Sequence, residues 1–173
     1  MQRVYYDVTE TPIGWAAALA SDKGIRLLTL RNSACEAVEE LGPDIPSDDP
    51  CLEALKGLWS ALESYFQGCP DAFTELTLDL EGAPRFHKAA WEACRTIPIG
   101  ETRSYKWLAA MAGNPRASRA AGQAMARNRL SVIVPCHRVI GSNGSLHGYG
   151  GGLDKKAALL EMERRHALKS SGA

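Results

Sequence analysis

No run of about 18 consecutive apolar residues occurs in this chain of 173 residues, so a membrane-spanning helix is not expected. The N-terminus lacks the basic-then-apolar pattern of a secretory signal, and we therefore expect a cytoplasmic protein. The five cysteines are irregularly spaced and include no C-x-x-C pair, which argues against a disulfide framework and a zinc knuckle. A hydrophobic fraction of 45% with ordinary Gly and Pro excludes a disordered or collagen-like chain.

The chain also lacks net charge, but this balance conceals two oppositely charged halves. Residues 1–81 carry 5 Lys+Arg against 15 Asp+Glu, and residues 82–173 carry 15 against 5. A basic half of this size is typical of a unit that binds a polyanion, and the acidic half is expected to be a solubilising partner domain. Two solvated surfaces without an anionic partner are the alternative that charge alone leaves open. We place the domain boundary between residues 81 and 82.

The first half has the pattern of a small α/β domain. Residues 4–8, 14–20 and 24–30 are rich in β-forming side chains and are separated by turn residues, which predicts a short antiparallel meander. Apolar residues at three- and four-residue spacing predict an amphipathic helix over residues 52–66. Alternation over residues 76–80 predicts one more strand.

The second half is predicted to be mostly helical. Its expected helices span residues 85–95, 105–111, 116–127 and 153–168. Gly113-Asn114-Pro115 separates the second helix from the third, and Pro115 suits the first turn of a helix. Two short helices around such a break, the second one basic and rich in Ala and Gly, are typical of a helix-turn-helix. A tightly packed core helix is the alternative, which the interleaved arginines argue against.

Cys136 follows an apolar run at residues 131–134, which we predict to be a strand, and it directly precedes His137. Only the thiolate of cysteine is a good nucleophile, and an ordinary thiol pKa of about 8.5 leaves little thiolate at neutral pH. His137 and Arg138 are groups that can lower this pKa. An inert buried cysteine is the alternative.

A base beside Cys136 needs both reach and orientation. Neighbouring side chains of a strand point to opposite faces, so His137 can serve Cys136 only through a turn or a water molecule. A working imidazole also needs an orienting group on its far nitrogen. Glu163 lies on a largely apolar stripe of the last helix, and we expect it to be partly buried and to supply that group. An ordinary surface glutamate is the alternative.

Four ordered motifs, at residues 97–105, 112–120, 135–140 and 148–153, resemble the catalytic domain of the O6-alkylguanine-DNA alkyltransferases. This family is also called the methylated-DNA–protein-cysteine methyltransferases. The resemblance runs nearly end to end through residues 84–166, and residues 11–14 and 65–68 resemble the family less specifically. It implies an α+β fold with a ribonuclease H-like sheet-and-helix domain, residues 1–81, before a mostly helical catalytic domain with a helix-turn-helix, residues 82–173.

The resemblance implies DNA repair by one irreversible alkyl transfer. An O6-alkylguanine would be flipped out of double-stranded DNA into a pocket, and its alkyl group would move to Cys136. By the same resemblance, His137 would activate the thiol through a water and Glu163 would orient His137. Tyr105 would donate a hydrogen bond to the purine as charge develops on the leaving guanine. Asn128 would hold the turn that precedes the cysteine strand.

The resemblance also assigns a minor-groove recognition helix, in which Arg119 replaces the extruded base. The residues expected at the DNA surface are Arg119, Tyr105, Arg116, Ala117, Ser118, Ala120, Gly122, Arg127 and Arg138. Those expected in the substrate pocket are Val139, Ser131, Tyr149, Gly150 and Met125. Val139 would contribute backbone carbonyls to base recognition.

Two positions depart from the family pattern. Gly150 stands where several members have Ser, so a side-chain hydroxyl for the guanine O6 is absent and only the amide N–H could serve. Ser131 stands where a proline or small apolar residue often lines the alkyl pocket, which leaves the tolerated alkyl size open. No cofactor and no metal are implied, and the zinc of some animal members is not expected because no cysteine precedes Cys35.

The expected partner is double-stranded DNA containing O6-alkylguanine, with O4-alkylthymine open as a second lesion, and a monomer is expected. The main alternative is an alkyltransferase-like sensor that binds the lesion without repairing it. Such proteins replace the reactive cysteine, commonly with tryptophan, whereas this chain has Cys136. A cysteine hydrolase would need an oxyanion site that the sequence does not signal. A basic module with an inert cysteine would need four motifs to coincide by accident.

Overall fold

The computed structural model describes residues 3–43, 45 and 52–172, which divide into two compact units. Unit 1 comprises Met1–Leu80 together with Arg129–Ser131, and unit 2 comprises Glu81–Asn128 together with Val132–Ala173. The division after residue 80 falls one residue from the boundary expected from the charge switch. The return of residues 129–131 to unit 1 was not expected from the sequence.

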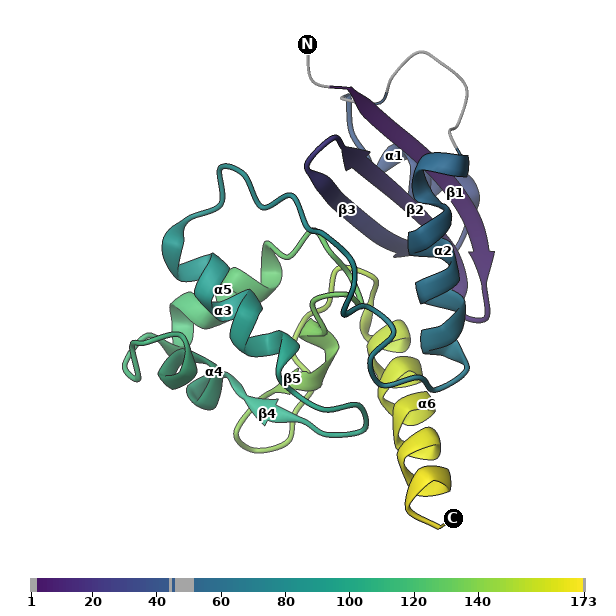
Figure 1. Ribbon diagram of the computed structural model, residues 1–173. Helices are drawn as coiled ribbons and strands as arrows, with labels where there is room; N and C mark the ends of the chain where they lie inside the picture. The colour runs from purple at the N-terminus through teal and green to yellow at the C-terminus, as the bar shows by residue number, and fades with distance from the viewer. Residues whose placement is uncertain (1–2, 44, 46–51, 173) are drawn as a thin grey trace. The chain divides into compact units, whose positions relative to one another are not determined.

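Unit 1 is built on a three-stranded antiparallel sheet in the order β1-β2-β3 (Figure 1). The strands are β1 (Val4–Thr11), β2 (Gly14–Ser21) and β3 (Gly24–Arg31), so the predicted meander is confirmed, with slightly longer strands. Two helices, α1 (Ala34–Glu39) and α2 (Leu52–Phe66), complete the unit, and α2 has the predicted bounds.

The two helices cover opposite faces of this sheet (Figure 1). Ala17, Leu19 and Leu27 form a buried cluster with Ala37 of α1. Asp7, whose side chain points to the other face because side chains alternate along a strand, accepts a hydrogen bond from Trp59 Nε1 of α2 at 2.7 Å. The alternation therefore buries both faces, which explains why β2 is almost wholly apolar.

Helix α1 was not predicted, although a local signal for it is present. Ser33 lies just before this helix, and its hydroxyl accepts a hydrogen bond from the Glu36 backbone N–H at 3.2 Å. Ser with Glu three residues later is the pattern of a helix N-terminus.

The predicted strand at residues 76–80 is wrong. Only an isolated parallel bridge joins Leu78 to Ile25 of β3, through Ile25 N–H to Thr77 O and Asp79 N–H to Ile25 O, both at 2.9 Å. A second short bridge occupies the same edge of β3. There Leu28 N–H donates to Arg129 O at 2.8 Å, and Ser131 N–H donates to Leu28 O at 2.9 Å.

Unit 2 is mostly helical, as predicted. Its helices are α3 (Arg85–Arg95), α4 (Tyr105–Met111), α5 (Ser118–Ala126) and α6 (Leu153–Ser171). The short strands β4 (Arg103–Ser104) and β5 (Val139–Ile140) pair in parallel. Ser104 caps α4 through its hydroxyl, which accepts from the Trp107 N–H at 3.1 Å.

The third helix begins two residues later than expected. Asn114 Oδ1 accepts a hydrogen bond from Arg116 N–H at 3.2 Å, and Asn114 O accepts from Ala117 N–H at 3.0 Å. These bonds form a turn that includes Pro115, so the proline belongs to the connection rather than to α5. Among the described residues, no helix is long and apolar enough to cross a membrane.

Candidate active site

Cys136 lies in a turn rather than at the end of a strand. Residues Cys136–Arg138 form one 3₁₀ turn, and Cys136 N–H donates to Val134 O at 2.7 Å. The strand predicted over residues 131–134 is wrong because Val132 has a φ of 71°, a left-handed conformation that interrupts a regular β-strand. The turn removes the geometric objection to adjacent cysteine and histidine, since their side chains need not point to opposite faces.

His137 is held by Glu163, as expected from the sequence. His137 Nε2 and Glu163 Oε1 are 2.7 Å apart, and both side chains are 0% exposed. Burial lowers the pKa of His137, with only partial opposition from the Glu163 hydrogen bond, so the ring is neutral at neutral pH. A neutral ring bonded to a carboxylate carries its proton on Nε2, which makes Nδ1 the basic nitrogen.

Glu163 stays ionised although it is buried. Burial opposes its charge, but the hydrogen bonds from His137 and from Arg138 outweigh this and lower the pKa of the carboxyl to about 2. The Gly100 backbone N–H adds a longer hydrogen bond to Glu163 Oε2 at 3.3 Å. Helix α6 therefore brings a fixed negative charge to the nucleophile turn, Cys136–Arg138.

Arg138, which was expected at the DNA surface, is buried in the structure. Its side chain is only 9% exposed and reaches Glu163 with both Nε and Nη2 at 2.9 Å. Its Nη1 donates to Ile97 O. A guanidinium with these buried partners cannot contact DNA phosphates without breaking them, so Arg138 serves the interior of unit 2.

The expectation that the side chains of His137 and Arg138 lower the thiol pKa is not met, and His137 lowers it through its backbone N–H instead. Burial raises the pKa of Cys136, and the two side chains that oppose this are Asn128, by a hydrogen bond, and Lys156, by its charge. Asn128 Nδ2 donates to Cys136 Sγ at 3.2 Å and to Val134 O at 2.9 Å. Cys136 is therefore a protonated thiol at neutral pH, and a base must remove its proton.

Cys136 opens into a cavity of about 760 Å³ within unit 2. The lining residues come from α4, α5, the nucleophile turn and the loop before α6: Tyr105, Ser118, Arg119, Gly122, Met125, Ala126, Cys136, His147, Gly148, Tyr149 and Gly150. Most of this wall is small or apolar, so a flat aromatic ligand can enter it with its polar edge toward a few hydrogen-bonding groups.

Tyr105 and Arg119 both line this cavity. Burial raises the pKa of Tyr105, so its hydroxyl remains a hydrogen-bond donor. Arg119 lines the cavity, is exposed, and forms no ion pair with any described residue. Its guanidinium is therefore available to an external partner.

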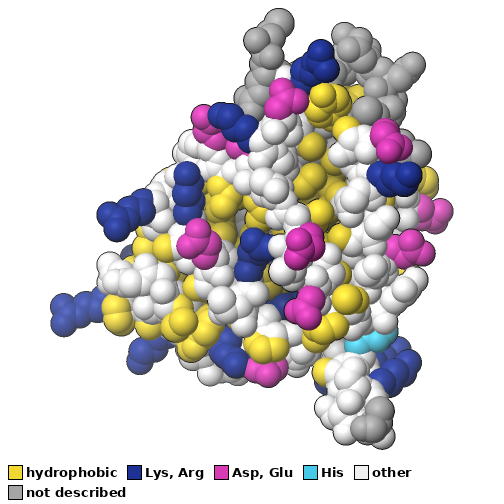
Figure 2. Space-filling view, viewed as in Figure 1, with side chains coloured by type: hydrophobic (Ala, Val, Ile, Leu, Met, Phe, Trp, Pro, Cys, Tyr) yellow, Lys and Arg dark blue, Asp and Glu magenta, His cyan; other side chains and the backbone are white. Residues whose placement is uncertain are grey.

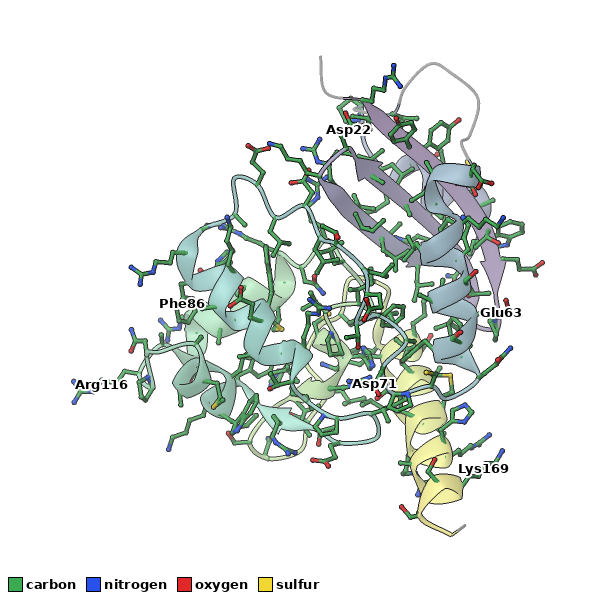
Figure 3. All side chains as sticks on the ribbon, in the orientation of Figure 1. Asp22, Glu63, Asp71, Phe86, Arg116 and Lys169 are labelled. Carbon is green, nitrogen blue, oxygen red and sulfur yellow. The ribbon has the colours of Figure 1, made fainter. Side chains whose placement is uncertain are left out.

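The remaining DNA-surface positions lie on or just before α5. Arg116 and Arg127 are exposed, whereas Ala117, Ser118, Ala120 and Gly122 are half-buried. Arg116 points away from unit 2 at the connection between α4 and α5 (Figure 3). Lysine and arginine side chains stand out from unit 2 in the space-filling view (Figure 2).

Two residues expected in the substrate pocket lie elsewhere. Ser131 does not line the cavity, because residues 129–131 pair with β3 in unit 1. Val139 is 0% exposed, and its carbonyl oxygen accepts a hydrogen bond from Lys156 Nζ at 2.8 Å. That carbonyl is therefore engaged by the protein itself. Tyr149, Gly150 and Met125 do line the cavity.

Two residues of the site, Lys156 and His147, were not predicted from the sequence. Lys156 is buried although lysine is normally exposed, and a charge at that helical position has no local signature. His147 lines the cavity with its ring edge-on to Tyr105, with ring centroids 5.7 Å apart. Its position just before the Gly148–Leu153 motif was the available signal.

Comparisons with known families cover both units. Residues 85–165 match the family model described as "6-O-methylguanine DNA methyltransferase, DNA binding domain". Residues 4–80 match the model of the "ribonuclease-like domain" of the same enzymes. The chain is 42% identical to a methylated-DNA–protein-cysteine methyltransferase of Methanosarcina barkeri, over 94% of this chain and 99% of the relative. It is 39% identical to that of Mycolicibacterium paratuberculosis, over 96% of each chain.

Solved structures agree with these sequence matches. The Mycobacterium tuberculosis O6-methylguanine methyltransferase superposes with a TM-score of 0.77 at 36% identity, covering 95% of this chain and 94% of that chain. Mycobacterium tuberculosis OGT in complex with DNA gives a TM-score of 0.79 at 36% identity, covering 94% of each chain. The chain thus belongs to the methylated-DNA–protein-cysteine methyltransferase family.

Proposed function

We propose that this protein repairs double-stranded DNA by taking a flipped O6-alkylguanine into the cavity of unit 2 and transferring the alkyl group, once, to Cys136. The observation that carries this proposal is the placement of a buried thiol on the cavity wall beside Tyr105, with a neutral imidazole in the same turn. The family membership supports the same chemistry.

The proposed transfer begins with removal of the Cys136 proton. Because the resting thiol is protonated, His137 accepts this proton at Nδ1 through a water while Glu163 holds Nε2. The thiolate then attacks the alkyl carbon in line. A bond from Sγ to carbon forms as the bond from carbon to guanine O6 breaks.

The leaving guanine takes the electron pair and finally a proton. The Tyr105 hydroxyl donates a hydrogen bond to the purine as its negative charge develops, which makes guanine a better leaving group. The proton removed from Cys136 balances the one that guanine gains. The thioether product cannot return the alkyl group, so each monomer acts on one lesion.

The DNA contact is proposed to run along α5. Its half-buried Ala, Ser and Gly positions let a groove approach the backbone closely, and exposed arginines flank them. Arg119 at the mouth of the cavity fills the gap left by the flipped base. The solved DNA complex of Mycobacterium tuberculosis OGT, a protein of the same fold, supports DNA as the partner.

The proposal is tested by intact-protein mass spectrometry after incubation with a duplex oligonucleotide containing one O6-methylguanine. We expect one added methyl group per chain and a stoichiometry that saturates at one. The Cys136→Ser variant should gain none, and Cys94→Ser, which removes another buried thiol of unit 2, should be methylated like the wild type. A wild-type protein that binds the lesion and remains unmodified would instead establish a lesion sensor.

A further inference from the structure

Lys156 of α6 is a fully buried lysine that takes no part in the transfer proposed for Cys136. Its side chain is 0% exposed, although lysine is almost never buried without a charged partner. Nζ donates to Val139 O at 2.8 Å and to His147 O at 3.2 Å. Both acceptors are neutral backbone carbonyls.

The buried carboxylate of α6 pairs with a residue other than Lys156. Glu163, further along α6, forms its ion pair with Arg138. Within the described part of the chain Lys156 has no ion pair. Because Arg138 and Glu163 compensate each other, the ammonium of Lys156 has only neutral partners while Cys136 is a thiol, and it gains a counter-charge when Cys136 becomes a thiolate.

We propose that Lys156 is a positioning residue for alkyl transfer, whose buried ammonium favours the Cys136 thiolate and ties the nucleophile turn to the wall of the base cavity. Only the experiment with DNA rests on the proposed function, because the Cys136 thiolate can be assayed without DNA.

The electrostatic half of the proposal follows from the groups around Nζ. The charge of Lys156 lowers the pKa of Cys136, and a Cys136 thiolate in turn raises the pKa of Lys156 against the effect of burial. The charge of Lys156 also helps to keep His137 neutral. A buried ammonium and a thiolate thus stabilise each other, since their attraction is only weakly screened inside a protein.

The tethering half follows from the two carbonyls. Val139 directly follows the nucleophile turn, and His147 belongs to the loop that forms one wall of the cavity with Tyr149 and Gly150. A single ammonium that binds both segments fixes the distance between the nucleophile and the wall against which the base would lie.

The first experiment compares the wild type with Lys156→Met, whose side chain has a similar length but carries no charge and no hydrogen-bond donor. Iodoacetamide labelling of Cys136 is followed by peptide-resolved mass spectrometry between pH 6 and 10. We expect the pH profile of Cys136 to move up by about one unit, with a roughly tenfold slower reaction at pH 7. Lys169→Met, at the exposed end of the same helix (Figure 3), should leave the profile unchanged.

A purely structural lysine would change stability without moving the pH profile of Cys136, so an unchanged midpoint in Lys156→Met overturns the claim that Lys156 favours the thiolate.

The reciprocal experiment does not depend on the folding of that variant. In Cys136→Ser no thiolate can form, and the Lys156 titration, followed by NMR at its Cε carbon, should move to lower pH than in the wild type. An unmoved titration would equally overturn the proposal.

The DNA arm tests the tether. Lys156→Met should lose more rate with an O6-methylguanine duplex than with iodoacetamide, because only the duplex requires an ordered cavity wall. Equal losses on both reagents would show that the tether is wrong. Absence of methyl transfer in the wild type would overturn the proposed function and leave the iodoacetamide result interpretable.

Discussion

Arg138 and Glu163 form a buried, bidentate ion pair, in which Arg138 Nε donates to Glu163 Oε2 and Arg138 Nη2 donates to Glu163 Oε1, both at 2.9 Å. The pair locks the nucleophile turn to α6 and leaves the remaining capacity of Glu163 for His137. Such a pair stabilises a fold only while it is complete, because either partner alone is an uncompensated buried charge.

We therefore expect Glu163→Gln to lower the free energy of unfolding by about 3–5 kcal/mol, since it leaves Arg138 buried without a counter-charge. Urea denaturation at pH 7 measures the loss. Glu161→Gln is the matched control on the same helix, because Glu161 pairs with Arg164 and Arg165 at the surface. That change should lower the free energy of unfolding far less, because exposed ion pairs contribute little. Equal losses in the two variants would contradict the structural importance of the buried pair.

His137 predicts a specific dependence of stability on pH. Its pKa is lowered in the fold, so between the ordinary value near 6.5 and the folded value the unfolded chain binds the extra proton. Its effect on stability is therefore absent above about pH 6.5, and the free energy of unfolding falls as the pH drops below that value. The stability that Glu163 contributes is lost at lower pH, as the pH falls from about 4.3 towards its folded pKa of about 2.

The measurement is the free energy of unfolding between pH 5 and 8, in the wild type and in His137→Asn, which cannot titrate in this range. The slope below about pH 6.5 should be smaller in the variant. Identical slopes would mean that His137 does not carry the pH dependence.

Gly100 packs so closely against α6 that a side chain there would clash. It has a φ of +80°, and a Cβ there would lie 2.7 Å from the Cβ of Ala167 in α6. Gly100→Ala should therefore lower stability by about 2–4 kcal/mol, from backbone strain and from overpacking. Gly113, with a φ of +91° and open space around its Cβ position, isolates the strain alone. Thermal unfolding should show a clearly smaller loss for Gly113→Ala.

Arg119→Ala should slow repair of O6-methylguanine in duplex DNA by about tenfold or more, because the flipped state loses the side chain that fills the gap. Reaction with a free-base analogue should be nearly unaffected, since no base pair is opened. Single-turnover rates with the two substrates provide the comparison. Equal losses on both would place Arg119 in the chemistry rather than in base extrusion.

Gly150→Ser tests the departure from the family pattern. A Cβ at Gly150 meets no atom within 4 Å, so the serine fits without displacing a neighbour. A hydroxyl that donates to guanine O6 is worth about 0.5–1.5 kcal/mol, which predicts methyl transfer about two- to tenfold faster. A slower variant would show that the backbone N–H already serves O6 and that the hydroxyl obstructs it.

Local patterns predicted the three strands of unit 1, the helix over residues 52–66 and the helical character of unit 2. These elements have strong periodicity or turn chemistry, which a single segment contains. The strand over residues 131–134 failed because its apolar side chains are buried by a turn at Val132 rather than by a strand. Hydrophobicity alone does not distinguish the two.

The partners of Glu163 illustrate what a sequence can and cannot show about the site. Its pairing with His137 was predicted because a buried carboxylate and an oriented imidazole each require a partner. The burial of Arg138 and of Lys156 was not predicted, because their acceptors include backbone carbonyls of Ile97, Val139 and His147. Every residue has such a carbonyl, so no residue type marks these sites.

The bridge between Leu28 and residues 129–131 has a consequence for how this chain can be divided. Cutting at the charge switch would give a first fragment whose third strand lacks its backbone partners at Leu28, an unpaired edge that invites aggregation. About a hundred residues separate the two sides of this bridge, so it closes only after most of the chain has been synthesised. Residues 129–131, just before the nucleophile, thus pair with β3 late in synthesis. An isolated acidic half should therefore include residues 129–131, joined to it by a linker.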